Sequence, residues 1–226
     1  MQSLLIVKYR KITFIVIMLM YLAGTIGLLI PYTQPYFKLV SPLNLWISLI
    51  LLISFHQDLN KTFIFTAIFI FLTGFFVEVA GVHTGIIFGK YRYGPTLGTQ
   101  LFDVPLVIGA NWLLLVYCSS TSVKTVFSIL KHKSFFNLIF IQSIVASMLM
   151  VGLDYLIEPV AISLDFWHWQ SDKIPARNFQ AWFLISFILN YFFLNAKFSK
   201  ANPLALLLLF LQFLFFISIS IFHHFV

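Results

Sequence analysis

Seven long apolar stretches limit what this chain can fold into more than any other feature of its sequence. A helix needs roughly 20 apolar residues to cross a bilayer, and about 17 to 25 are tolerated. With 61% hydrophobic and 9% charged residues, the chain is also more apolar than a soluble domain requires. The stretches are residues 12–30, 41–55, 63–82, 104–120, 135–157, 179–195 and 203–222. They predict an all-α fold, a polytopic bundle of about seven transmembrane helices that forms one integral membrane domain over residues 1–226 in the cell membrane.

The chain is basic, with a net charge of +7, which would suggest nucleic acid as a partner if the chain were soluble. Its Lys and Arg residues instead lie between the apolar stretches, where such residues set topology and contact lipid headgroups. We therefore expect membrane lipid, and no nucleic acid, among the partners. The single cysteine, Cys118, excludes an intramolecular disulfide and a cysteine-based metal site.

The distribution of Lys and Arg predicts the orientation in the membrane, because cytoplasmic loops carry the excess of these residues. If the N-terminus is inside, nine of them lie inside and five lie outside. The nine are Lys8, Arg10, Lys11, Lys61, Lys124, Lys131, Lys133, Lys197 and Lys200, and the five are Lys38, Lys90, Arg92, Lys173 and Arg177. This excess predicts an N-in, C-out topology.

Six of the seven acidic residues fall near one face of the membrane in this topology, and only Asp58 lies on the other side. The six are Glu78, Asp103, Asp154, Glu158, Asp165 and Asp172. They lie in or beside two long loops, residues 83–103 and 158–178. We therefore expect these loops to meet over a shared polar pocket at the outer face.

Carboxyl groups at membrane depth cost a few kcal/mol each on insertion scales, so they indicate function by default. Asp154 and Glu158 are four residues apart and share one face if the helix continues, although Pro159 predicts a turn directly after Glu158. Two such carboxyl groups cannot both ionise cheaply in a low dielectric, so one would hold the proton that a general acid requires. The alternative is that these acids cap helix ends or neutralise Arg92, Lys173 or Arg177.

The segment "FFVEVAGVHTGIIFGKYRYGPTLG" places glycines every four residues and then clusters aromatic residues. Gly81, Gly85 and Gly89 predict a small-residue stripe for close helix packing, which would hold Glu78 and His83 rigidly. "KYRYGPTLG" predicts an ordered lid rather than a helix because a Gly-Pro turn follows its tyrosines. An interfacial aromatic belt is the alternative for the tyrosines.

The second loop, "FWHWQSDKIPARNFQAW", alternates aromatic residues around His168. Aromatic faces stabilise a cation by about 0.5 to 2 kcal/mol, so Trp167 and Trp169 are candidates for sheltering one. A metal held by Glu78, His83, Asp154 and His168 is a minor alternative, since both histidines stand alone in the sequence. We expect no metal site.

Five segments in a fixed order resemble the carotenoid biosynthesis protein family, which includes the CruF-type carotenoid 1′,2′-hydratases and the bisanhydrobacterioruberin hydratases. The segments are "EVAGVHTGIIFGKYRYGPTLG", "DVPLVIGANWLLLVY", "LDYLIEPVA", "FWHW" and "IPARNFQAWF". The resemblance covers roughly residues 74–186, whereas the first two apolar stretches and the last carry no comparable signature. The positions that fit the family pattern are Glu78, Gly81, Gly89, Tyr91, Tyr93, Pro105, Trp112, Asp154, Glu158, Pro159, Trp169, Pro175, Asn178 and Trp182.

The resemblance implies addition of water to the terminal isoprenoid double bond of an acyclic carotenoid such as lycopene or γ-carotene, giving a tertiary alcohol without a cofactor. The implied partners are the acyclic carotenoid substrate, water and other enzymes of the carotenoid pathway. In this chemistry an acid protonates the alkene, water captures the tertiary cation, and a base removes the extra proton. A desolvated carboxylic acid, a second carboxylate and aromatic walls suit these steps.

The candidate residues follow from this chemistry and from the patterns above. The candidate catalytic residues are Glu78, Asp154, Glu158 and His83, with His83 as a proton relay and either the Asp154 and Glu158 pair or Glu78 as the proton donor. The candidate substrate-binding residues are Tyr91, Arg92, Tyr93, Trp112, Trp167, Trp169, Asn178 and Trp182, among which Asn178 would position water.

Two other functions stay open at this point. A membrane enzyme similar to lycopene cyclase would protonate the same end group but capture the cation with an internal double bond, and polar residues such as Asn178 and Asp172 favour water instead. A proton-coupled transporter would need acids at mid-depth and broken helices in paired halves. The gathering of the acids at one face and the lack of a visible repeat disfavour the transporter.

Overall fold

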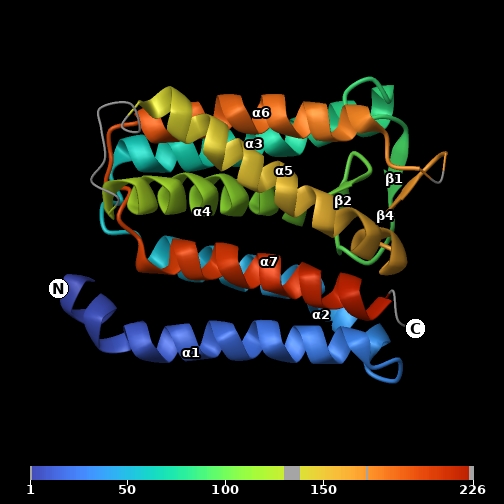
Figure 1. Cartoon of the computed structure of the whole chain (residues 1–226), viewed down its shortest axis with the longest axis horizontal. Coiled ribbons are helices and arrows are strands. Elements are labelled where there is room, and N and C mark those ends of the chain that lie inside the picture. The colour runs from blue at the N-terminus through green and yellow to red at the C-terminus, as the bar shows by residue number, and fades with distance from the viewer. Residues whose placement is uncertain (1, 130–137, 172, 224–226) are drawn as a thin grey trace.

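The structure, a computed structural model, describes residues 2–129, 138–171 and 173–223. Within these residues, long helices run side by side and short strands gather at one end (Figure 1). The helices are α1 (Gln2–Leu29), α2 (Gln34–Ser54), α3 (Lys61–Thr84), α4 (Val107–Ile129), α5 (Ile139–Ser163), α6 (Ala176–Asn195) and α7 (Pro203–His223). The strands are β1 (Tyr91–Tyr93), β2 (Gln100–Leu101), β3 (Val104–Pro105) and β4 (Trp167–Trp169). The expectations for Lys131, Lys133 and Asp172 fall outside the described residues.

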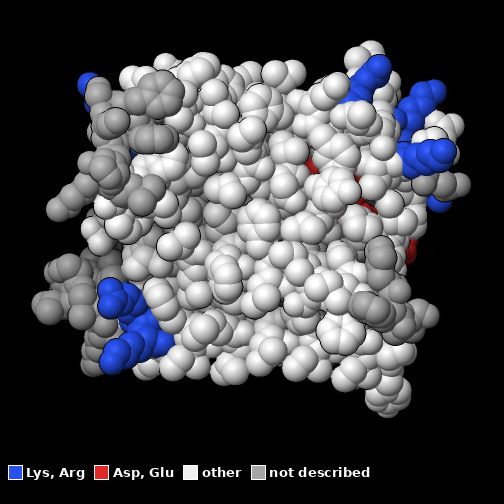
Figure 2. Space-filling view, viewed as in Figure 1, with Lys and Arg blue, Asp and Glu red and all other residues white. Residues whose placement is uncertain are grey.

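The apolar composition of the helices confirms the polytopic membrane bundle. In the described part of the chain, six helices, α1 to α5 and α7, are long and apolar enough to cross a membrane. The remaining helix, α6, packs along α5 although it is more polar. On the face drawn in Figure 2, Lys and Arg lie at the two ends of the molecule, and the surface between them is uncharged except for small areas of Asp and Glu, as a bilayer favours.

The central helix of the bundle is α4, which packs against α2, α3, α5, α6 and α7 and is buried along most of its length. The opposite case is α1, which lies at the edge and packs against α2 and α7. Helix α1 begins at one end of the bundle, and α7 ends at the other end, which is also the end that carries the strands (Figure 1). This arrangement fits the predicted topology, but which end faces the cytoplasm stays a prediction.

Several helix limits differ from those expected. The second helix begins at Gln34 instead of residue 41, because Pro35 is at its first turn, where a proline is tolerated, and Pro42 lies inside it. The fourth begins at Val107 because residues 104–105 form β3. The expected start of the fifth, residue 135, is outside the described residues.

The prediction that Pro159 turns the chain after Glu158 is wrong. Helix α5 passes through Pro159 and ends at Ser163. Membrane helices tolerate an internal proline because packing and neighbouring groups compensate the lost hydrogen bond. Asp154 and Glu158 therefore lie on one face of a continuous helix.

A Schellman motif ends α5 and directs the chain into β4. The backbone N–H of Asp165 donates to the carbonyl of Ile162 at 3.2 Å, and that of Phe166 donates to the carbonyl of Ala161 at 2.8 Å. Asp165 takes the left-handed position of the motif, with φ of 61°. This turn folds the two tryptophans of β4 back over α5.

The expected glycine stripe is wrong beyond Gly81, because α3 ends at Thr84. Gly85 caps the helix with φ of 64°, its N–H donating to the carbonyl of Gly81 at 2.8 Å, and Gly89 has φ of 117°. These two glycines supply left-handed backbone that other residues adopt at a cost. Close packing is made by Gly74, the glycine one heptad before Gly81, which belongs to the same predicted stripe; an added Cβ there would lie 2.4 Å from the Cβ of Trp112.

The two long loops meet as predicted, because β1 and β4 form an antiparallel ribbon. In its register Tyr91 lies opposite Trp169, Arg92 opposite His168 and Tyr93 opposite Trp167. We call these two strands, residues 91–93 and 167–169, the lid ribbon. The ribbon covers the ends of α3 and α5 at one end of the bundle (Figure 1).

Candidate active site

Glu78 is buried near the end of α3 and accepts three side-chain hydrogen bonds. The hydroxyl groups of Tyr91 and Tyr93 donate to its Oε2 at 2.5 and 2.8 Å. The indole Nε1 of Trp112 donates to its Oε1 at 3.1 Å. The carboxyl group is therefore held from two sides, by the lid ribbon and by α4.

Asp154 and Glu158 form the second part of the site, on consecutive turns of α5. The side-chain nitrogen of Asn178, at the start of α6, donates to Asp154 Oδ2 at 2.8 Å and to Glu158 Oε1 at 3.0 Å. These three side chains are buried, with at most 2% of each residue exposed. The Asn178 amide at the start of α6 thus joins the two carboxyl groups of α5.

The lid ribbon adds further donors because its side chains alternate in direction. Trp167 and Trp169 donate from Nε1 to Glu158 Oε2 at 3.1 and 2.8 Å. Tyr91 and Tyr93, on the paired strand, donate to Glu78 on the same side. The ribbon therefore contacts both parts of the site with four aromatic donors.

The protonation of the two tyrosines follows from their surroundings. Burial raises the pKa of Tyr91 and of Tyr93 well above the ordinary phenol value of 10.0, and the neighbouring Glu78 raises both further. Both phenols consequently stay neutral at physiological pH. A neutral phenol is a hydrogen-bond donor, which is the role that both hydroxyl groups have toward Glu78.

A small cavity lies among these groups and has a volume of about 30 Å³. This space is large enough for at least one water molecule, and its polar lining offers the partners that a buried water needs. Ten of the twelve residues predicted for the site line it: Glu78, Asp154, Glu158, Tyr91, Tyr93, Trp112, Trp167, Trp169, Asn178 and Trp182. The structure thus brings together residues from β1, β4 and helices α3 to α6.

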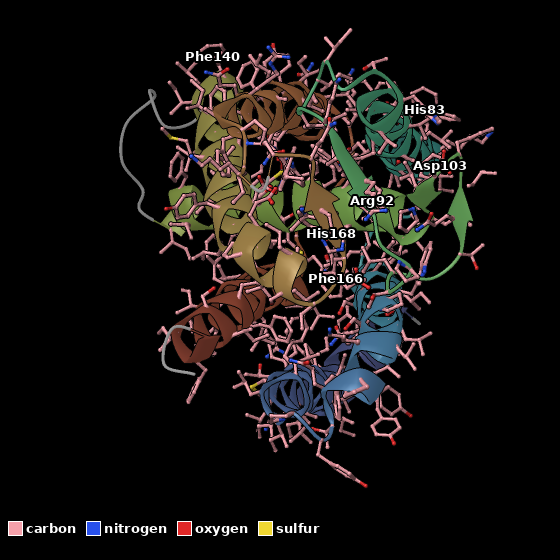
Figure 3. The ribbon with its side chains drawn as sticks, turned by 90° about the vertical axis from the view of Figure 1, so that its right-hand side faces the viewer. His83, Arg92, Asp103, Phe140, Phe166 and His168 are labelled. Atoms are coloured by element: carbon pink, nitrogen blue, oxygen red, sulfur yellow. The ribbon has the colours of Figure 1, made fainter. Side chains whose placement is uncertain are left out.

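His83 and Arg92 are the two predicted site residues that the structure does not bring to the cavity. The side chain of His83 is half exposed, and its Nε2 lies 3.7 Å from Asp103. Arg92 and its partner across the ribbon, His168, lie on the side of the ribbon away from the acids, where His168 contacts Asp165 at 2.5 Å. Figure 3 shows His83 beside Asp103 and, apart from them, Arg92 and His168. The alternative metal site, which needs His83 and His168 beside Glu78 and Asp154, is therefore not formed by these described residues.

Basic partners for the three buried acids are missing from the described residues. The ion pairs found there join His83 to Asp103 and His168 to Asp165. Arg177, one of the counter-ions considered above, is exposed and donates to the carbonyl of Ile86 at 3.2 Å. The acids are thus satisfied by uncharged donors, which argues against a simple structural ion pair.

The chain is similar in sequence to known proteins. The sequence profile described as "Carotenoid biosynthesis protein" matches residues 36–226, which is most of the chain. The chain belongs to this family. A bisanhydrobacterioruberin hydratase of Haloarcula japonica is 26% identical over 121 residues, covering 48% of this chain and 36% of that relative. The match therefore spans about a third of the relative's length. No solved structure gives a significant match.

Membership of this family agrees with the six helices of the described residues that are long and apolar enough to cross a membrane. The predicted site residues that line the cavity all lie inside the matched range.

Three residues that line the cavity of this carotenoid biosynthesis protein were not predicted: Phe88, Ile108 and Asn111. Asn111 had a signal, because it is a polar side chain in the apolar run "VIGANWLLLVY" and directly precedes Trp112. Phe88 had none, since it is one of 28 phenylalanines. It lies in the cavity wall because Gly81 makes room, an added Cβ there being 2.6 Å from the Phe88 ring.

Proposed function

We propose that this protein is a cofactor-independent carotenoid hydratase that adds water to the terminal isoprenoid double bond of an acyclic carotenoid. One observation carries the proposal. Three buried carboxyl groups, which have no basic partner among the residues that the structure describes, surround a cavity of about 30 Å³ that is large enough for water. Burying three ionised carboxylates together would be very costly, so the site is built to hold at least one transferable proton.

The reaction divides into three balanced steps. A carboxylic acid gives its proton to the less substituted carbon of the terminal double bond, which leaves a carboxylate and a tertiary cation. The oxygen of water bonds to the cation, and a second carboxylate takes the proton that this water loses. The second carboxyl group then returns this proton to the first, by way of water, which restores the enzyme. The sum is alkene plus water giving a tertiary alcohol, with no change of oxidation state over the molecule.

The pattern of hydrogen bonds supports one assignment of the acid and the base. Glu78 and Glu158 each accept three hydrogen bonds, whereas Asp154 accepts one, from Asn178. The proton is therefore best placed on Asp154, which acts as the acid with Glu158 as its neighbour. Glu78, held by three donors, is oriented to act as the base that receives the proton of water.

Aromatic side chains stabilise the cation between these steps. Trp112 and Trp182 stack at 4.2 Å between ring centroids, and both line the cavity. Tyr93 and Trp167 line it from the lid ribbon, their rings meeting edge to face at 6.1 Å. Aromatic faces attract a cation, most strongly where water is excluded. A site with such walls lowers the cost of the cationic intermediate.

The test is expression of the chain in a bacterial host that makes lycopene, followed by liquid chromatography and mass spectrometry of the pigments. A product heavier than lycopene by one water supports the proposal. An isomer of unchanged mass would show that an internal double bond captures the cation, as in a cyclase. Glu78→Gln and Asp154→Asn should abolish the hydrated product, and Asp103→Asn, an acid-to-amide change at the same end of the bundle, should retain it because Asp103 is exposed.

A further inference from the structure

A large apolar groove lies beside the acid cavity, and most of its wall comes from helices that carry no predicted site residue. Its volume is about 370 Å³, which is within the range of pockets that hold small-molecule ligands. Side chains of α1, α2 and α7 form most of its walls, among them Tyr21, Gly24, Phe37, Gln212 and Phe215. These helices carry none of the three buried acids.

The groove adjoins the acid cavity. Ile108, Asn111 and Trp167 line both spaces. Phe166, which precedes Trp167, also lines the groove and lies between the lid ribbon and the α1 and α2 helices (Figure 3). A ligand lying in the groove would therefore reach Glu78, Asp154 and Glu158 past Asn111.

The wall of the groove contains one polar point. Gln212 lies there with 3% of the residue exposed, and its side-chain oxygen has no hydrogen-bond partner in the described part of the chain. This oxygen needs a hydrogen-bond donor, which a hydrocarbon chain does not offer, so water or another polar group would have to satisfy it.

Resting on the proposed hydratase function, we propose that this groove binds the acyclic polyene chain of the substrate and delivers its end group past Asn111 into the acid cavity. The aromatic and aliphatic walls suit a long conjugated hydrocarbon, and the polar junction at Asn111 marks where the reacting end begins. The helices around the groove thus select the substrate, whereas α3 to α6 and the lid ribbon transform it.

A pair of glycine substitutions tests the groove. Gly24 faces it, and an added Cβ there lies 3.5 Å from the Phe215 ring, an ordinary contact distance, so Gly24→Leu fills the groove without a backbone clash. Gly152→Leu on α5 is the matched control, because an added Cβ at Gly152 meets nothing within 4 Å. Two measurements are made on purified protein in detergent: hydration of lycopene, and binding of lycopene by quenching of tryptophan fluorescence.

We expect Gly24→Leu to weaken lycopene binding about tenfold or more and to raise KM accordingly. Gly152→Leu should bind and hydrate lycopene as the unchanged protein does. Hydration that proceeds equally in both variants would overturn the groove and leave the hydratase standing. Binding that Gly24→Leu weakens, without any hydration, would overturn the hydratase and retain the groove. Neither binding nor hydration in the unchanged protein would overturn both, whereas a groove found to hold only membrane lipid would overturn the groove alone.

Discussion

Two buried polar clusters lie at opposite ends of the bundle, and they differ in the groups that they bring together. At the end away from the lid ribbon, His56 Nδ1 contacts the hydroxyl of Tyr117 at 2.5 Å, and its Nε2 contacts the carbonyl of Asp58 at 2.9 Å. Asn202 donates to the same hydroxyl at 2.9 Å and to the carbonyl of Leu52 at 2.8 Å. We call His56, Tyr117 and Asn202 the histidine cluster.

The histidine cluster resembles the acid site in burial and in aromatic content. His56 stacks on Phe63 at 3.8 Å, much as Trp112 stacks on Trp182. Yet neither the acid cavity nor the groove is lined by its three members. Each polar group there meets another protein group directly, so the cluster joins α2, α4 and α7. The acid site instead brings three carboxyl groups together around the acid cavity. This arrangement suits acid–base chemistry better than it suits stability.

The largest effect that separates the two ends is expected from Asp154→Asn. The amide keeps the shape of the side chain but has no acidic proton to give, and general acid catalysis contributes typically 10²–10⁴-fold. We expect hydration of lycopene to fall at least about 10²-fold while the unfolding temperature in detergent changes little. Asp103→Asn is the control and should leave the rate unchanged. A variant that hydrates at the normal rate would remove Asp154 from the role of acid.

A smaller effect, on stability alone, is expected from Tyr117→Phe at the histidine cluster. Losing the hydroxyl takes one partner from His56 and one from Asn202, both buried, which costs about 1–3 kcal/mol in the free energy of unfolding. Hydration per folded molecule should stay normal. Thermal unfolding in detergent measures the first quantity and a pigment assay the second, with the exposed Tyr36→Phe as control. Loss of activity without loss of stability would show that this cluster also takes part in function.

The smallest effect concerns pH and Lys200, which packs over the Phe198 ring at 3.3 Å beside the histidine cluster. Burial lowers the pKa of Lys200 to about 7, with a contribution from Lys124. The unfolded state keeps this proton up to about pH 10.4, so between pH 7 and that value it binds more protons than the folded state. Stability should therefore rise with pH in this window. The unfolding temperature should increase less from pH 7 to pH 9 in Lys200→Met than in the unchanged protein. Equal increases would contradict the lowered pKa of Lys200.

Local features of the sequence were sufficient for the architecture and for most of the site. The length and composition of the apolar stretches predict the membrane helices, because in lipid each helix must make the hydrogen bonds of its own backbone N–H and C=O groups. The spacing of Asp154 and Glu158 predicts a shared helix face, and the alternation of "YRY" and "WHW" carries the aromatic donors. The error at Pro159 came from a local preference that the packing of α5 against α6 overrides.

The tertiary structure decided which side chains point where. His83 and Glu78 are five residues apart on α3, yet one faces Asp103 at the surface and the other faces the cavity. Arg92 lies between two tyrosines of the site but on the other side of the lid ribbon, since the pairing with β4 sets the direction of each side chain. Local periodicity separates these side chains, but the packing of the elements decides which face of each one turns to the cavity.

The sequence by itself determined that this chain spans a membrane with helices, that its acids gather at one end and that two aromatic loops accompany them, because these properties depend on residues close in the chain. Only the tertiary structure decided that Asn178 joins Asp154 to Glu158 and that the helices α1, α2 and α7 form a groove beside the acids. Both depend on contacts between segments far apart in sequence, whose geometry the packing of the bundle sets.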